Sequence, residues 1–215
     1  MNTRMLLATL AGLGLTLLAP ALASGEVTIL AFGDSLTAGY GLARGEAFPA
    51  VLEEMLRAEG LSVRVINAGL SGDTCAGGRA RLARYLQAPP QAAILELGAN
   101  DLLRGQDPAA VEDNLAAMLR ELTSLGVKVL LAGMAAPAHW GPQYDQSFEA
   151  IYPRLAKAHG VDLYPHFLAG VDDDPHLTMD GLHPTARGVR VIAQGIFPQV
   201  KRLVLAVMAE SKSAK

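Results

Sequence analysis

Short apolar runs alternate with longer helical patterns along the chain, and this alternation limits the fold more than any other feature. The apolar runs occupy residues 26–32, 61–67, 92–98, 127–134 and 161–165. The helical patterns occupy residues 48–60, 75–87, 107–126, 143–160 and 186–210. Strands that alternate with helices of this length form βαβ units and a parallel sheet, and helices on both of its faces explain the continuously apolar strands. We therefore expect an α/β fold with about five parallel strands.

Proline and capping residues predict where several helices begin or end. Asp107 and Pro108 suit the cap and the first position of a helix. Pro153 is expected to kink the following helix or to start a new one, and Pro198 to break the last helix. We expect the tail, residues 210–215, to fray.

The first residues resemble a secretory signal peptide rather than part of the fold. A basic start with Arg4 precedes an apolar stretch, and Ala21 and Ala23 form the small-residue pattern of a cleavage site. The alternative, an uncleaved membrane anchor, is disfavoured because the apolar stretch is short for a membrane span. We expect residues 1–23 to be removed, residues 24–215 to form one domain without a stable membrane anchor, and the protein to be periplasmic or secreted.

Composition excludes some functions and leaves others open. The net charge is −3 without a long run of either sign, and aromatic residues make up 5% of the chain, so nothing indicates a nucleic-acid partner. A single cysteine, Cys75, cannot form an internal disulfide. It could be a catalytic nucleophile, but we expect a small, semi-buried residue at the start of a helix.

Polar and glycine-rich segments follow the predicted strands, where parallel α/β sheets bind their ligands. Ser35 comes just after the first strand, residues 69–74 after the second and residues 98–105 after the third. A serine beside a glycine is usually a turn residue. The convergence of these segments at one edge of the sheet favours a functional role for Ser35.

A catalytic serine needs a base, and His183 is the best candidate. Asp180 precedes it by three residues and could hold its imidazole in the required tautomer. Gly181 permits a sharp turn between them, and Pro184 restrains the backbone after the histidine. The alternative is a turn that merely caps the last helix and leaves His183 exposed.

The other histidines have weaker contexts. His159 suits the cationic end of a helix, and no obvious carboxylate accompanies His139 or His166. His176 is a possible rival because three aspartates, residues 172–174, precede it, although they are typical of a solvated loop.

Donors for a developing oxyanion are also available. The backbone N–H of Gly72 could approach a ligand closely, Asn100 offers a side-chain amide, and Ser35 can add its own N–H. Asn100 taken alone would be an ordinary turn residue. The chain lacks a G-x-S-x-G motif, a phosphate-binding loop, a dinucleotide fingerprint and a convincing zinc spacing, so we predict no metal site.

Together these segments resemble the GDSL family of serine esterases and lipases, also called SGNH hydrolases. The matching blocks are "FGDSLTAGYG" with Ser35, "NAGLSGDTCAGGRARL" with Gly72, "LELGANDLLRG" with Asn100 and "DGLHPTARG" with Asp180 and His183. They occur in order over almost the whole predicted mature chain. The resemblance is strongest to the secreted bacterial subgroup with thioesterase, arylesterase and lysophospholipase activities.

The resemblance implies a three-layer α/β/α, flavodoxin-like fold with strand order 2-1-3-4-5. It implies Ser35 as nucleophile, His183 as general base and then acid, and Asp180 as the orienting carboxylate. It also implies an oxyanion hole formed by Ser35, Gly72 and Asn100. The reaction would be acyl transfer to water through an acyl-enzyme, without a cofactor.

The substrate is expected to be a small acyl ester or thioester, and the protein a monomer. Trp140 and Tyr144 lie in or beside a loop after the fourth predicted strand and are predicted to contact substrate, the alternative being that Trp140 packs on the body of the protein. A carbohydrate acetylesterase on the same fold is a rival function, and a non-catalytic binding protein is a remote one.

Overall fold

The structure of the protein is a computed structural model that describes residues 25–135 and 140–213. The predicted signal peptide, residues 1–23, lies outside the described residues. The strands are β1 (Val27–Gly33), β2 (Val63–Gly69), β3 (Ala92–Glu96), β4 (Lys128–Ala132) and β5 (Asp162–Tyr164). The helices are α1 (Ser35–Ala38), α2 (Phe48–Ala58), α3 (Cys75–Arg81), α4 (Ala99–Leu103), α5 (Pro108–Ser124), α6 (Pro142–Glu149), α7 (Ile151–His159) and α8 (Ala186–Ser213), with short 3₁₀ turns η1 (Arg44–Glu46) and η2 (Leu82–Tyr85).

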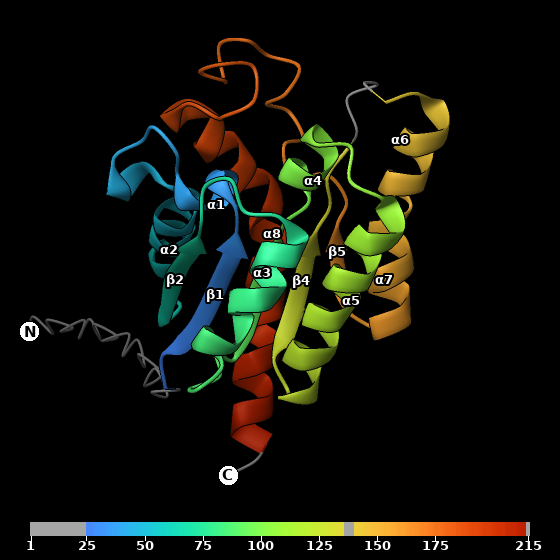
Figure 1. Ribbon diagram of the computed structural model, residues 1–215. Coiled ribbons are helices and arrows are strands. Elements are labelled where there is room, and N and C mark those ends of the chain that lie inside the picture. The colour runs from blue at the N-terminus through green and yellow to red at the C-terminus, as the bar shows by residue number, and fades with distance from the viewer. Residues whose placement is uncertain (1–24, 136–139, 214–215) are drawn as a thin grey trace, which may run out of the picture.

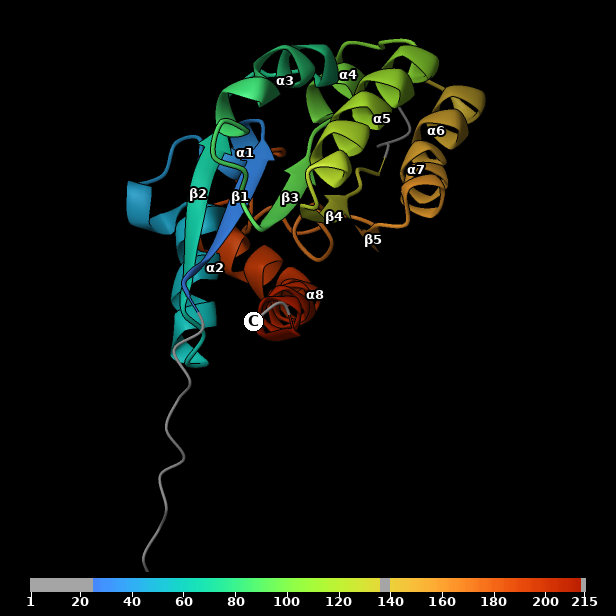
Figure 2. The same ribbon diagram turned by 90° about the horizontal axis from the view of Figure 1, so that it is seen from below.

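The five strands form one parallel sheet in the order β2-β1-β3-β4-β5, as the family resemblance implies. Helices α3, α5 and α7 cover one face of the sheet, and α2 and α8 cover the other (Figures 1 and 2). The α/β prediction and the strand order are therefore confirmed. The register places Gly33 of β1 beside both Gly69 of β2 and Glu96 of β3, so the carboxyl ends of these three strands lie together.

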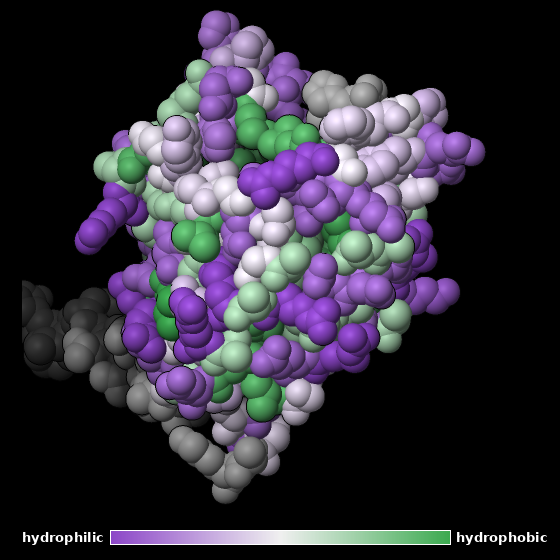
Figure 3. Space-filling model, in the orientation of Figure 1, coloured by the Kyte–Doolittle hydropathy of each residue, from purple (hydrophilic) through white to green (hydrophobic). Residues whose placement is uncertain are grey.

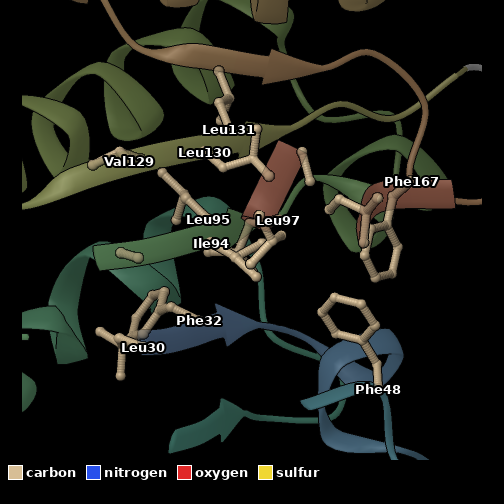
Figure 4. Close-up of a cluster of buried hydrophobic side chains, with 14 of the residues drawn as sticks. Leu30, Phe32, Phe48, Ile94, Leu95, Leu97, Val129, Leu130, Leu131 and Phe167 are labelled. Carbon is tan, nitrogen blue, oxygen red and sulfur yellow. The ribbon is translucent and has the colours of Figure 1, made fainter. Parts of the chain in front are cut away.

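The apolar strands are explained by this three-layer arrangement. Every residue of β3 is buried, whereas β2, at the edge of the sheet, has only two buried residues, Val63 and Ala68. Figure 4 shows side chains of β1, β3 and β4 packed between the helical layers. Phe48 of α2 and Phe167, after β5, meet edge to face with ring centroids 5.1 Å apart, which extends this core toward the carboxyl ends of the strands.

Helix boundaries agree with the capping prediction at α5 and differ at α8. The Asp107 side chain accepts a hydrogen bond from the N–H of Ala109, as expected of a cap. The predicted break at Pro198 is wrong, because α8 continues through it. Pro198 lies on the exposed side of α8, as does Gln194, whose carbonyl the proline leaves without its helical partner. Solvent can satisfy that carbonyl while the buried side of the helix remains packed.

The predicted fraying of the tail is also wrong for the residues that the structure describes. α8 extends to Ser213, and Glu210 in its last turns forms an ion pair with Lys128 of β4. By length and composition alone, α8 is the one described helix that could cross a membrane. Its apolar side, however, covers the sheet and contacts α2, which is the position of a core helix.

Candidate active site

Ser35 is positioned by the abrupt change from β1 to α1. β1 ends at Gly33, and the Asp34 side chain caps the helix by accepting the N–H of Leu36 at 2.9 Å. Ser35 is the first residue of α1 and is 8% exposed. A serine at this point is fixed by a strand on one side and by a capped helical turn on the other.

Ser35, His183 and Asp180 form a continuous hydrogen-bonded chain. Ser35 Oγ lies 3.0 Å from His183 Nε2, and His183 Nδ1 lies 2.7 Å from Asp180 Oδ2. Because a carboxylate only accepts, Nδ1 carries the proton, and Nε2 is left free to accept the serine hydroxyl proton. This is the arrangement that activates a serine nucleophile.

The loop before α8 holds Asp180 and His183 on the same side. Asp180 Oδ1 accepts the backbone N–H of Leu182 at 3.1 Å and that of His183 at 2.7 Å. These bonds and the imidazole contact lower the pKa of Asp180 from 3.8 to about 2, with the backbone bond from His183 as the largest cause. Gly181 has a φ of +84°, which is the sharp turn predicted for it.

The two ends of this loop are joined. Thr178 and Pro184 form an antiparallel bridge, and the N–H of Met179 donates to the carbonyl of His183 at 2.7 Å. The loop is therefore a closed turn that presents the imidazole to Ser35.

Gly72 and Asn100 come from two segments that are bound to each other. Gly72 has a φ of +81°, a backbone conformation that favours glycine. Lack of space is not the reason for a glycine there, because a Cβ would meet no atom within 4 Å. Arg104, after α4, donates to the carbonyl of Gly72 at 3.1 Å, and Asp101 of α4 accepts the N–H of Cys75 at 2.9 Å. The loop after β2 is thereby fastened to the helix that carries Asn100.

Asn100 is oriented by a buried carboxyl group beside the serine. Its Nδ2 donates to Asp34 Oδ2 at 3.1 Å, which leaves its second amide hydrogen available. Burial raises the pKa of Asp34 from 3.8 to about 6, against the opposing effects of its hydrogen bonds from Leu36 and Asn100.

A second buried carboxyl, Glu96, lies directly behind Asp34. Its Oε2 accepts the Thr37 hydroxyl at 2.6 Å and the N–H of Asp34 at 3.4 Å, and its Oε1 has no protein partner among the described residues. Burial, and then the charge of Asp34, raise the pKa of Glu96 well above its ordinary range. Sequence reasoning missed this pair, because the apolar run around Glu96 indicates that it is buried but does not show which side chains it meets.

Arg81 connects the ends of β1 and β2 beneath the Gly72 loop. Its guanidinium donates to the carbonyls of Gly33 and Ala68, each at 2.8 Å, and to Asp73 Oδ2 at 2.6 Å. It also lies 3.9 Å from the centre of the Phe32 ring. Asp73 follows Gly72 directly, so this buried ion pair holds the loop against the sheet.

Tyr40 is a further residue of the site that sequence reasoning missed. Its ring centroid lies 4.5 Å from that of His183, at an interplanar angle of 38°. Leu70, Leu103 and Met179, on segments at the carboxyl ends of the strands and on the loop before α8, are also exposed hydrophobic side chains. The space-filling view shows an apolar patch near this end of the molecule (Figure 3).

Trp140 and Tyr144 lie against α4 and the segment that follows it. Trp140 Nε1 donates to the carbonyl of Leu102 at 2.7 Å, and its ring lies over Gly105. The Tyr144 hydroxyl donates to the carbonyl of Gln106 at 2.7 Å. The structure thus displays the packing described above as the alternative for Trp140, and substrate contact by either side chain stays a prediction.

The structure brings His183, and not His176, to the serine. The backbone N–H of His176 donates to Asp174. The expectation that no carboxylate accompanies His166 is wrong, because its Nε2 lies 2.9 Å from Asp172 Oδ2. These two residues are separated in sequence by a turn, so the pairing is visible only in the fold.

Two histidines remain. His159 ends α7 as predicted, with its pKa lowered by burial. His139 lies outside the described residues.

Cys75 begins α3 as predicted, but it is fully buried rather than semi-buried. Burial, followed by the nearby Asp101, raises the pKa of its thiol well above the ordinary range. A thiol held in its protonated form is a poor nucleophile. Within the described part of the chain, no group of three His, Cys, Asp or Glu side chains could hold a metal ion.

Comparisons with known proteins agree with this geometry. Residues 31–191 match the family described as GDSL-like Lipase/Acylhydrolase. Esterase TesA from Pseudomonas aeruginosa is 38% identical over 82% of this chain and 89% of its own length. The Escherichia coli protein called thioesterase 1/protease 1/lysophospholipase L1 is 38% identical over 82% of this chain and 85% of its own. The crystal structure of AlinE4, an SGNH-hydrolase family esterase, has a TM-score of 0.71 and 46% identity, covering 83% of this chain and 97% of that one.

Proposed function

The chain belongs to the GDSL-like lipase/acylhydrolase family and is a serine esterase that acts on small ester substrates, and from this premise we propose the role of each residue in its catalytic centre. Ser35 Oγ attacks the acyl carbon while His183 Nε2 accepts its proton. Asp180 holds the proton on Nδ1 and stabilises the imidazolium that forms. The observation that carries this proposal is the 3.0 Å distance between Ser35 Oγ and His183 Nε2.

The developing negative charge on the substrate oxygen needs donors that already point at it. We assign this role to the N–H groups of Ser35 and Gly72 and to the free amide hydrogen of Asn100. In the described part of the chain, neither of these two N–H groups donates a hydrogen bond. Both N–H groups can therefore donate to the substrate oxygen without first breaking an internal hydrogen bond.

The second half of the reaction reverses the proton transfers. The imidazolium of His183 protonates the leaving alcohol or thiol, and an acyl group remains on Ser35. Water then takes the position of the leaving group, His183 accepts its proton, and the acyl-enzyme is hydrolysed. Apart from the substrate and water, each step uses only groups of this centre, for acyl esters and thioesters alike.

Labelling with a fluorophosphonate tests these assignments. The wild type should react covalently and lose activity toward p-nitrophenyl acetate, whereas Ser35→Ala should neither react nor hydrolyse. Ser211→Ala, which changes a distant serine near the end of α8, is the matched control and should behave as the wild type. Labelling of folded Ser35→Ala would contradict the proposed nucleophile.

We further propose that residues 1–23 direct export and are removed, leaving a periplasmic or secreted monomer without a stable membrane anchor. The support is the basic, apolar and Ala-Leu-Ala order at the start of the sequence. Expression of the full chain in a bacterium, followed by N-terminal sequencing of the periplasmic protein, should give a chain that starts at Ser24. An intact Met1 in the membrane fraction would contradict cleavage.

A further inference from the structure

A cavity of about 400 Å³ adjoins the catalytic centre. Ala99, which precedes Asn100, lies on one side of it, and Gly181 and Leu182, which separate Asp180 from His183, lie on another. Because these lining residues are bonded directly to the catalytic segments, the cavity is the space into which one side of a bound ester can extend.

The lining of this cavity divides into an aliphatic part and a polar part. Large aliphatic side chains come from α4, from the segments after β4 and β5, and from the loop before α8: Leu102, Leu103, Met134, Leu168 and Leu182. Burial of each methylene group against such a wall is favourable. The aliphatic part therefore suits the chain of an acyl group.

The polar part consists of His166, Asp172 and Asp173, all after β5. His166 Nε2 lies 2.9 Å from Asp172 Oδ2, and the two side chains are 30% and 35% exposed. A carboxylate only accepts, so in the neutral ring the proton is on Nε2, and Nδ1 carries the lone pair. Nδ1 has no protein partner in the described part of the chain. His166 Nδ1 and the Asp173 carboxylate are thus hydrogen-bond acceptors on residues that line the cavity.

We propose that this cavity receives the acyl group and that His166, oriented by Asp172, selects acyl chains that carry a hydrogen-bond donor, such as a hydroxyl group, over plain alkyl chains. This inference rests on the proposed catalytic centre. A plain alkyl end would remove water from acceptors that gain no partner, which is unfavourable. A hydroxyl group restores the lost bond, whereas a terminal carboxylate would face the charge of Asp173.

Three p-nitrophenyl esters of equal acyl-chain length distinguish a preference for a hydrogen-bond donor from a preference for any polar group. The distal end of the acyl group is a methyl, a hydroxyl or a methoxy group, because methoxy is polar but cannot donate. At about pH 8, the wild type should favour hydroxyl over methoxy in kcat/KM by roughly three- to tenfold. Because this comparison needs no variant, it tests the proposal even if substitutions disturb folding.

The variants then assign the preference to its residue. His166→Leu and Asp172→Ala should each lower the hydroxyl-to-methoxy ratio to about one. His176→Leu, whose histidine follows the same aspartate-rich segment and does not line the cavity, should keep the wild-type ratio. A wild type without the preference, or a folded His166→Leu that retains it, would overturn the proposal.

Hydrolysis of p-nitrophenyl acetate reports separately on the catalytic centre. His176→Leu, whose side chain does not line the cavity, should leave its kcat/KM unchanged, and His166→Leu should still be labelled by a fluorophosphonate, because the label reacts with Ser35. If instead Ser35→Ala were labelled, the proposed nucleophile would fail, whatever the three esters show. The two proposals can therefore fail independently.

Discussion

Replacing Asp34 by asparagine should make the protein more stable near neutral pH and at the same time a poorer catalyst. Burial raises the pKa of the Asp34 carboxyl from 3.8 to about 6. A carboxyl whose pKa is higher in the folded chain than in the unfolded chain stabilises the fold fully at pH values below its unfolded pKa. This stabilisation is lost as the pH rises through its folded pKa. For Asp34, this loss falls between about pH 4 and about pH 6.

The size of this effect follows from the pKa difference. The change from 3.8 to about 6 corresponds to roughly 3 kcal/mol of unfavourable free energy at pH 8, where the buried carboxyl is charged. Asparagine avoids that charge and keeps an oxygen for the N–H of Leu36. It also turns an amide toward the amide of Asn100, losing a hydrogen bond of about 1 kcal/mol. The net gain in the free energy of unfolding should be about 1–2 kcal/mol at pH 8 and none at pH 4.

Activity should change in the opposite direction. With two amide nitrogens facing each other, the Asn100 side chain must rotate, and the substrate oxygen loses a donor. Loss of one such donor lowers kcat by roughly 10²–10³. Urea unfolding followed by circular dichroism at both pH values, together with kcat for p-nitrophenyl acetate, measures both effects.

Asp73→Asn is the matched control for this experiment. Asp73 is also a buried aspartate, but it pairs with Arg81, so its replacement leaves a buried guanidinium without its partner. That variant should lose about 3–5 kcal/mol. The reasoning about Asp34 would be refuted if Asp34→Asn were destabilised by the same amount at pH 4 and at pH 8.

Three further predictions concern other positions. Asp180→Asn should lower kcat by as much as about 10⁴, because it favours the wrong imidazole tautomer, and His183→Ala should lower kcat by more. Equal pH–rate profiles for the wild type and Asp180→Asn would contradict this prediction. Cys75→Ala should retain esterase activity within about twofold, because the buried thiol stays protonated; a loss of several orders of magnitude in a folded variant would make Cys75 part of the chemistry. Trp140→Ala should alter the ratio of long-chain to short-chain ester turnover by releasing the carbonyl of Leu102 on the cavity wall, and an unchanged ratio would leave Trp140 a packing residue.

The layers of the fold could be predicted from the sequence because they depend on local patterns. Buried strands such as β3 are almost continuously apolar, with Glu96 as the exception, and α5 carries its own cap and first-position proline. The order of the strands could not be derived in this way, because alternation does not say which strands are neighbours; it came from the family resemblance. Pro198 was misjudged because its effect depends on which side of α8 faces solvent, and only tertiary packing decides that.

The residues of the candidate site could be located because parallel strands end at one edge of the sheet. This placed Ser35 and Asn100 near each other before any geometry was known. The contacts that orient them were not predictable, since each joins distant segments. Glu96 reaches Asp34 and Thr37 across neighbouring strands, and Tyr40 reaches His183 from the other end of the sequence.

The three-residue spacing of Asp180 and His183 was informative because one carboxylate serves two purposes. Asp180 Oδ1 accepts the N–H groups of Leu182 and His183 and so forms the turn, while Oδ2 accepts Nδ1 of the imidazole. The Asp180 side chain is 49% exposed, so solvent screens its charge and its value to the site is mainly geometric. A local turn can therefore orient a base that meets a serine 148 residues away, provided that the sheet has already fixed the position of that serine.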